Sequence, residues 1–316
     1  MSDLSFVSYS QNGEDVVLWR ALSGVAGGRY VEVGGNDPTV DSVSRAFYER
    51  GWSGVVLEPV AEFAARFREE RPRDTVLEAA AGSGSGETTL HVIAGTGLSS
   101  TDPEVAASQR ARGWQTVETV VQQVRLDDVL AEHVGEGEDV HFLLVDVEGA
   151  EREVLGSLDL HRWRPWVLVV EATAPSTDSP THEAWEHLVL SAGYRLVLFD
   201  GLSRFYVADE HADLAPRLSY PASPADGAII RRDQVTAERI ARLEEDLRTT
   251  ERDLVRWRGV ALNGWAGVQG HTGTTSGIEA AELRAEMQRL QATLSWRVTA
   301  PLRQVRRLQT GLARRR

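Results

Sequence analysis

The amino-acid sequence predicts an α/β fold in which a doubly wound, mostly parallel sheet ends in an antiparallel hairpin and is followed by amphipathic helices. Apolar runs of strand length alternate with helix-like segments up to about residue 210, an alternation typical of crossovers between parallel strands. Two β-rich runs flank residues 200–203, which is a hairpin signal. After residue 230, apolar residues recur at spacings of three and four, as in amphipathic helices.

Five apolar runs are predicted to be strands buried on both faces of the sheet. They lie at residues 29–35, 54–59, 74–82, 140–147 and 165–173. Helices are predicted between these strands, at residues 40–50, 60–71, 126–133 and 149–157.

The chain between the third and fourth strands is an insertion. Residues 87–93 and 116–126 have the composition of accessory strands, and the segment between them is rich in Gly, Ser and Thr. A segment of this kind over a sheet edge is either a mobile lid or a surface loop. The sequence leaves both interpretations open.

The chain is predicted to divide at residue 230 into a body and a C-terminal region. The body comprises residues 1–230; a coiled-coil-like helix follows at 231–258, a Gly/Thr-rich linker at 259–277, and a basic amphipathic helix and tail at 278–316. The C-terminal helices could form a hairpin, pair between chains, dock a partner or pack on the body. The heptad positions of the first helix are Ile240, Leu243, Leu247, Thr250, Leu254 and Trp257.

Composition excludes several classes of site. The chain has no Cys, which excludes thiolate nucleophiles, zinc–thiolate sites and iron–sulfur sites. All 34 basic residues are Arg, which excludes a Lys Schiff base and a P-loop. The net charge of −13 is uneven: residues 1–230 hold 17 Arg and 37 acids, whereas residues 231–316 hold 17 Arg and 10 acids. The acidic body argues against nucleic acid as a ligand.

The sequence contains neither a signal-peptide pattern at its start nor a run of 18 uncharged apolar residues. We therefore expect a cytoplasmic protein without a transmembrane segment. The basic tail is compatible with docking at a membrane surface, although a solvated terminus is the simpler expectation.

A glycine turn follows the first of the five strands, at the edge where open α/β sheets bind their ligands. Gly34 and Gly35 in YVEVGGNDP allow a sharp turn, but the sequence departs from the G-x-G-x-x-G pattern of dinucleotide sites. An adenosyl ligand without phosphates fits better. Glu32 can hold a cationic group, and Glu58, at the end of the next strand, can accept hydrogen bonds from ribose hydroxyls. The alternative for Glu58 is an acid at a helix N-terminus.

Five motifs follow one another along the chain: YSQNGEDVVLWRAL, YVEVGGNDPTVDSVSRAFYERGWSGVVLEP, GTGLSS, LLVDVEGAEREVL and WVLVVEAT. The stretch from about residue 6 to 210 resembles the FkbM-type branch of S-adenosylmethionine-dependent methyltransferases, and the C-terminal helices lie outside it. The resemblance implies a Rossmann-like class I methyltransferase fold, with a seven-stranded, mostly parallel sheet and an antiparallel final hairpin. It also implies methylation of a hydroxyl.

The resemblance implies roles in binding S-adenosylmethionine. Gly34 and Asn36 would face the methionine part of the cofactor, Glu58 the ribose, and residues 80–83 the adenine. Gln11 belongs to an N-terminal motif that is placed to close over the cofactor, although helix capping and surface charge explain this motif equally well. The residues expected to contact the cofactor are Gln11, Glu32, Gly34, Asn36, Glu58 and Asp146.

Two acids at neighbouring strand ends are predicted to be catalytic. Asp146 ends the fourth strand and Glu171 the fifth, so both face the same crevice. Some small-molecule O-methyltransferases with this sheet hold Mg²⁺ through carboxylates from these two strand ends, which makes both residues candidate metal ligands. The third ligand would be Glu148 or Asp178. Glu148 has an alternative as an acid in the first turn of a helix, the role we expect for Glu151.

His182, after the fifth strand, is predicted to be the catalytic base. A histidine titrates near neutrality, and Glu183 or Glu186 could orient its ring. The alternative is a surface or helix-capping histidine.

The sequence therefore predicts an O-methyltransferase that uses S-adenosylmethionine and acts on a hydroxyl of a sugar, a glycan or a related natural-product metabolite. Two alternatives remain. A nicotinamide-dependent oxidoreductase is disfavoured by the missing third glycine and the hairpin-terminated sheet. A non-catalytic assembly protein with a degenerate methyltransferase body is disfavoured by Gly34, Glu58, Asp146 and Glu171.

Overall fold

A seven-stranded sheet organises the first part of the chain. The computed structural model describes residues 6–135, 137–175, 177, 179–270, 284–289 and 292, and the chain divides into two units, residues 1–239 and 240–316. The strands of the sheet, in spatial order, are β10 (Tyr194–Phe199), β11 (Ser203–Ala208), β9 (Val167–Glu171), β8 (Phe142–Val145), β2 (Arg29–Val33), β3 (Ser53–Leu57) and β4 (Thr75–Leu77).

Strand direction in this sheet matches the prediction. All neighbouring strands from β9 to β4 pair in parallel, whereas β11 is antiparallel to both β9 and β10. The β10–β11 hairpin turns at the predicted residues 200–203. The Rossmann-like sheet with an antiparallel final hairpin is therefore confirmed.

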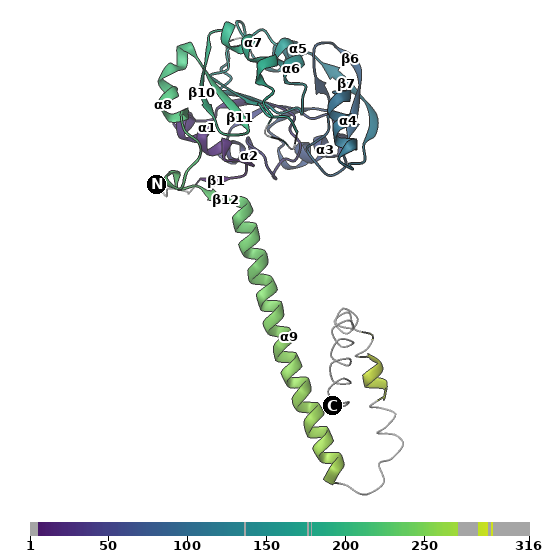
Figure 1. Cartoon of the computed structure of the whole chain (residues 1–316). Helices are drawn as coiled ribbons and strands as arrows, with labels where there is room; N and C mark the ends of the chain where they lie inside the picture. The colour runs from purple at the N-terminus through teal and green to yellow at the C-terminus, as the bar shows by residue number, and fades with distance from the viewer. Residues whose placement is uncertain are drawn as a thin grey trace. The chain divides into compact units, whose positions relative to one another are not determined.

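Helices cover both faces of the sheet, and Figure 1 shows α5, α6 and α7 on one side and α1, α2 and α3 on the other. On β2, Val31 and Val33 enter a core with α5, α6 and α7, whereas Tyr30 enters a second core with α1, α2 and α3. Because side chains alternate along a strand, Glu32 belongs to the face of Tyr30. The helices are α1 (Glu14–Leu22), α2 (Arg45–Tyr48), α3 (Ala61–Glu70), α5 (Leu126–His133), α6 (Glu151–Gly156) and α7 (Glu186–Ser191).

The insertion forms a separate sheet of three strands: β5 (Ala80–Ala81), β7 (Val117–Val124) and β6 (Gly86–Val92). The prediction of one strand over residues 74–82 was wrong, because β4 ends at Leu77 and β5 joins the second sheet. The two accessory strands are confirmed. Between them lies a helix that the sequence analysis missed, α4 (Pro103–Ala111), whose first amides donate to the side chain of Asp102.

Shorter elements complete this unit. β1 (Val7–Ser8) pairs in parallel with β12 (Ile229–Ile230). The helix predicted at residues 40–50 is helical only in α2. The remaining short helices are η1 (His182–Ala184), η2 (Asp209–Leu214), α8 (Ala215–Leu218) and η3 (Pro224–Asp226).

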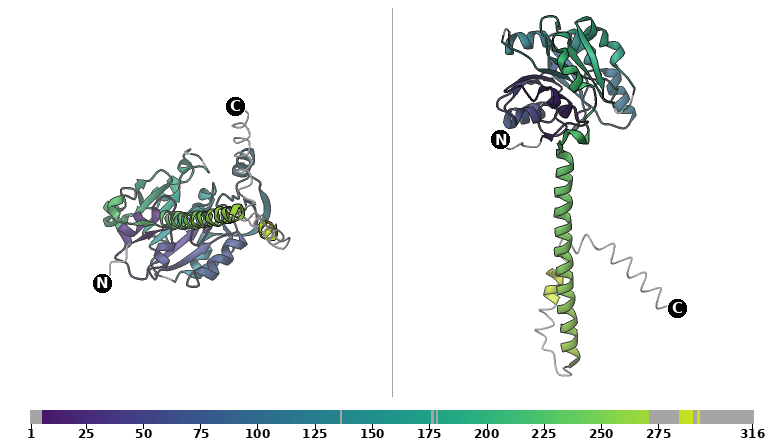
Figure 2. Two further views of the ribbon diagram at one scale, coloured as in Figure 1. Left: turned by 90° about the horizontal axis from the view of Figure 1, so that it is seen from below. Right: turned by 90° about the vertical axis from the view of Figure 1, so that its left-hand side faces the viewer.

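Helix α9 (Arg231–Gly270) is continuous in all views (Figure 2). It extends past the predicted end at residue 258, so the predicted linker begins within a helix. Residues 271–283 and most of the predicted basic tail lie outside the described residues. In the part of the chain that the structure describes, we find no helix with the length and hydropathy needed to cross a membrane.

Candidate active site

A pocket of about 210 Å³ lies at the carboxyl ends of β2, β3 and β8. Strand β2 lies between β3 and β8. Of these two, β3 is the next strand of the sheet along the chain, whereas β8 follows much later in the sequence. Open α/β sheets bind ligands at such a point. Glu171 and His182 are not part of the lining. All six residues predicted to contact the cofactor are part of it: Gln11, Glu32, Gly34, Asn36, Glu58 and Asp146.

The glycine turn is required by close packing against the end of β8. Gly34 has a φ of +87°, and a Cβ added to it would lie 1.7 Å from the carbonyl oxygen of Asp146. The amide of Asp146 donates to the carbonyl of Val33 at 3.0 Å. The turn therefore holds the two strand ends together, a role that the sequence analysis did not assign to Gly34.

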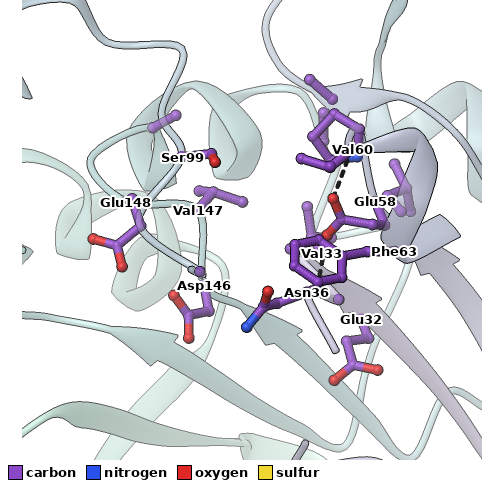
Figure 3. A pocket seen from close by; sticks show the side chains of 18 of the residues that line it. Glu32, Val33, Asn36, Glu58, Val60, Phe63, Ser99, Asp146, Val147 and Glu148 are labelled. Atoms are coloured by element: carbon purple, nitrogen blue, oxygen red, sulfur yellow. Dashed lines mark hydrogen bonds between the residues drawn. The ribbon is translucent and has the colours of Figure 1, made fainter. Parts of the chain in front are cut away.

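Glu58 joins the glycine loop to the start of α3. Its Oε2 accepts from the amide of Asn36 and its Oε1 from the amide of Val60, both at 2.7 Å (Figure 3). Burial raises the pKa of Glu58 to about 7, and the two amides act against this rise. Each carboxylate oxygen has a second lone pair, so both can accept a further hydrogen bond from a ligand.

Glu32 lies beneath the loop and already has a cationic partner. Its Oε2 accepts from the Ser44 hydroxyl and lies 3.7 Å from Nη1 of the buried Arg71. Arg71 also donates to the Ser42 hydroxyl and the Pro38 carbonyl, which anchors the chain after the glycine turn. Burial raises the pKa of Glu32 to about 7, although Arg71 opposes the rise.

Three acids form a carboxylate cluster beside the pocket: Asp146, Glu148 and Glu171. Each offers an oxygen, and these oxygens lie within 4.8 Å of one another. Within the described residues, one buried oxygen of Glu148 and one of Glu171 have no hydrogen-bond partner. Asp146 is exposed through the pocket, yet protein atoms surround it closely enough for burial to raise its pKa.

Burial and mutual repulsion make the carboxylate cluster hard to ionise. Burial, followed by the charge of Asp146, raises the pKa of Glu148 to about 8. Burial and the neighbouring carboxylates raise the pKa of Glu171 far above its ordinary value. A bound cation or an added proton would reduce the repulsion between these carboxylates and give an unpartnered oxygen a partner.

Backbone strain is concentrated at the pocket. Among the described residues, positive φ at a non-glycine residue occurs at Asn36, Asp41 and Glu148, and all three line the pocket. A left-handed backbone at such residues is costly and clusters at functional sites. The sequence carries no local signal that marks Asp41, and it leaves two roles open for Glu148.

The model of the methyltransferase FkbM domain matches residues 32–196, which is more than half of the chain. The chain belongs to the FkbM methyltransferase family. The predicted family is confirmed, and with it the general activity, methyl transfer from S-adenosylmethionine. Membership also sets aside the nicotinamide oxidoreductase.

Three solved structures have a weak likeness to this FkbM methyltransferase, with low sequence identities and low TM-scores. A TehB-like SAM-dependent methyltransferase from Corynebacterium glutamicum is 9% identical, with a TM-score of 0.34, and covers 62% of this chain and 87% of its own. An O-methyltransferase from Bacillus cereus is 12% identical, with a TM-score of 0.33, and the match covers 64% of this chain and 82% of that protein. A SAM-dependent methyltransferase from Geobacter sulfurreducens is 13% identical, with a TM-score of 0.31, and the match covers 68% of this chain and 75% of that protein. Among curated proteins, the comparison finds no match.

The insertion supplies one wall of the FkbM methyltransferase pocket. The Ser100 hydroxyl donates to the carbonyl of Glu148 at 2.7 Å, and a Cβ on Gly97 would lie 2.9 Å from the side-chain nitrogen Nδ2 of Asn36. The Gly/Ser/Thr-rich segment is therefore part of the site in this conformation. Its lining residues are Thr96, Gly97, Leu98, Ser99 and Thr101.

His182 lies in η1, outside the pocket lining. Its imidazole has no hydrogen-bond or ion-pair partner among the described residues. The suggestion that Glu186 orients it was wrong, because Glu186 accepts from Arg204 at 2.6 Å and from the Tyr206 hydroxyl at 2.9 Å.

Two acids remain: Glu151, which was expected at the start of a helix, and Asp178, which was considered as a third metal ligand. Glu151 is the first residue of α6 and accepts from the amide of Gly149 at 2.9 Å, which confirms its helix-start role. Asp178 lies outside the described residues.

Proposed function

We propose that this FkbM methyltransferase is an O-methyltransferase that methylates a hydroxyl of a sugar, a glycan or a related natural-product metabolite. The observation that carries the proposal is the carboxylate cluster beside the pocket. S-adenosylmethionine supplies a methyl group on a positively charged sulfur, so its leaving group is already activated. The protein then has to align the acceptor oxygen and remove its proton.

The charge of the pocket supports an adenosyl sulfonium as the ligand. Among the described lining residues, every charged side chain is an acid: Glu32, Asp41, Glu58, Asp146 and Glu148. Such a wall attracts the sulfonium and ammonium groups of the cofactor and repels the pyrophosphate of a dinucleotide.

Individual roles follow from position in the lining. We assign the methionine part of the cofactor to the loop of Gly34 and Asn36, and the ribose to the free lone pairs of Glu58. Gln11 would close over the cofactor from the segment before α1. Ala80 and its apolar neighbours would face the adenine.

A titration by calorimetry tests cofactor binding without knowledge of the acceptor. Wild-type protein should bind both S-adenosylmethionine and S-adenosylhomocysteine. Glu58→Gln should weaken both by roughly tenfold, about the value of one charge-assisted hydrogen bond. Glu62→Gln, an exposed acid on α3, is the matched control. Absence of binding to either compound would refute the proposal.

The base is assigned to the carboxylate cluster or to His182. The raised pKa of Glu148 makes its ionised form a stronger base than an ordinary carboxylate, which suits it to accept the proton of the acceptor hydroxyl. His182 remains a candidate because its imidazole is free. Transfer of labelled methyl groups to a panel of glycosides would decide: near-full rate in His182→Ala excludes the histidine, and an unchanged pH profile in Glu148→Gln excludes that residue.

The carboxylate cluster also fits a divalent cation such as Mg²⁺. Three hard oxygen donors at short separation, two with unpartnered oxygens, are suited to this ion. Asp146 and Glu171, with Glu148 as the third ligand, would hold it, and it would lower the pKa of an acceptor hydroxyl. Calorimetry with Mg²⁺ should show binding to wild type and its loss in Glu171→Gln. No binding, with methyl transfer unchanged after chelation, would exclude the ion.

Membership of the FkbM methyltransferase family argues against the non-catalytic alternative, and an assay of methyl transfer tests it directly. A body that only displays the C-terminal helices would bind the cofactor and transfer no methyl group to any acceptor in the panel. Detectable transfer to any of the glycosides would remove this alternative.

A further inference from the structure

Helix α9 carries an apolar stripe that nothing in the described residues covers. Its members follow the a and d positions of a heptad, with Ile240, Leu247 and Leu254 at a. Leu243, Thr250 and Trp257 occupy the d positions. The five apolar members are between 44% and 68% exposed.

The outer face of α9 and the flank of the stripe at Glu244 carry charged side chains. Arg248 lies 3.6 Å from Glu244 and 3.5 Å from Glu245, and Arg252 lies 2.8 Å from Glu245. These pairs span one or two turns and stabilise the helix locally. A helix with one apolar stripe and a charged outer face gains most by burying the stripe against another helix.

We propose that α9 forms a parallel, two-stranded coiled coil with α9 of a second copy of this chain. In that arrangement each g residue faces the e residue five positions later on the partner helix. Arg239 then faces Glu244, and Asp253 faces Arg258, so two of the three charged g–e combinations attract. Asp246 opposite Glu251 is the exception.

Charge also selects the parallel over the antiparallel arrangement. With the a and d layers aligned in antiparallel helices, Ile240 lies opposite Trp257, and the flanking positions bring Asp246 to Asp253 and Glu244 to Glu251. The Asp246–Asp253 contact and the Glu244–Glu251 contact each occur twice in the dimer, and both are repulsive. The parallel dimer therefore has four attractive and two repulsive contacts, whereas the antiparallel dimer has four repulsive ones.

The absence of cysteine makes the arrangement directly testable. Full-length wild type should elute with twice the mass of one chain in light scattering. Under mild oxidation, Ile240→Cys should form a disulfide-linked dimer, because the two copies of position 240 are adjacent only in the parallel arrangement. In an antiparallel pair they are separated by 17 residues, about 25 Å along the helix. Glu245→Cys, on the outer face, is the control and should cross-link far more slowly.

A mixture of two cysteine variants gives a second test of the relative orientation of the two α9 helices. Equimolar Ile240→Cys and Trp257→Cys chains should give only the two symmetric products. A product that joins position 240 to position 257 would show antiparallel pairing and overturn the proposal. A monomer mass for wild type, or equal cross-linking of Ile240→Cys and Glu245→Cys, would overturn it as well.

Charge substitutions test the proposal without disturbing the stripe. Glu251→Arg replaces the one repulsive combination by an attractive one, and should lower the dimer dissociation constant several-fold. Asp253→Arg creates a repulsive combination and should raise the constant by a similar factor. Helicity by circular dichroism should stay the same in both, which separates pairing from helix formation. No shift in the constant for either variant would contradict the proposed register.

Discussion

Glu148→Gln is expected to make the ligand-free protein more stable above neutral pH. Burial and neighbouring charge raise the pKa of Glu148 from an ordinary 4.5 to about 8, so the folded protein keeps a proton that the unfolded chain loses. Between these two values the native state binds more protons, and its stability falls as pH rises. Glutamine carries no such proton, so the variant should avoid this loss.

The size of the effect follows from the shift in pKa. A difference of about 3.5 pKa units, at 1.36 kcal/mol each, sets an upper bound of about 5 kcal/mol. Relaxation and the coupled charge of Asp146 reduce this bound, and we expect about 2 kcal/mol at pH 8. For a body of this size, that corresponds to a melting temperature about 4–8 °C higher.

Melting temperatures measured from pH 5 to pH 8.5, in the presence of a chelator, check this expectation. Wild type and Glu148→Gln should coincide near pH 5, where Glu148 is protonated, and diverge as pH rises. Glu153→Gln changes an exposed acid of the nearby helix α6 and should follow wild type. Parallel curves for wild type and Glu148→Gln would refute the assignment of a strained, hard-to-ionise carboxyl group to Glu148.

Three further outcomes are expected. Gly34→Ala would force a Cβ to within 1.7 Å of the Asp146 carbonyl at a φ of +87°, and should lower stability by about 3 kcal/mol in urea denaturation; Gly24→Ala, where nothing lies within 4 Å, should cost little. Ser100→Ala should cost about 1–3 kcal/mol in the same assay, because the buried carbonyl of Glu148 loses its donor; an unchanged midpoint would show that the insertion does not hold the site. Mg²⁺ at about 100 times its dissociation constant should stabilise wild type at pH 8 by about 2.7 kcal/mol, whereas NaCl of equal ionic strength should not.

Local pattern was sufficient where one segment carries its own signal. The centres of the predicted strands, residues 142–145 and 167–170, are apolar throughout, as expected for strands covered on both faces, and they lie in β8 and β9. The hairpin around residues 200–203 and the heptads of α9 are equally local. The helix at residues 40–50 failed because Ser42 and Ser44 are held by Arg71, which is remote in sequence.

The sequence predicted the site residues whose positions are set by the ends of strands. Carboxyl ends of parallel strands share one edge of a sheet, so Glu32, Glu58 and Asp146 could be placed together from their positions after apolar runs. His182 and its supposed partner Glu186 had no such constraint. The structure places His182 outside the pocket lining and directs Glu186 to Arg204.

Apolar periodicity and the alternation of strands and helices along the chain therefore come directly from the sequence, because they depend on neighbours a few residues apart. The carboxylate cluster does not. Its oxygens meet within 4.8 Å because β8 and β9 pair, while the left-handed backbone of Glu148 is accompanied by a hydrogen bond from Ser100. Both contacts join segments far apart in sequence, where no local preference operates. Packing, rather than propensity, turned Glu148 from the start of a helix into a member of the site.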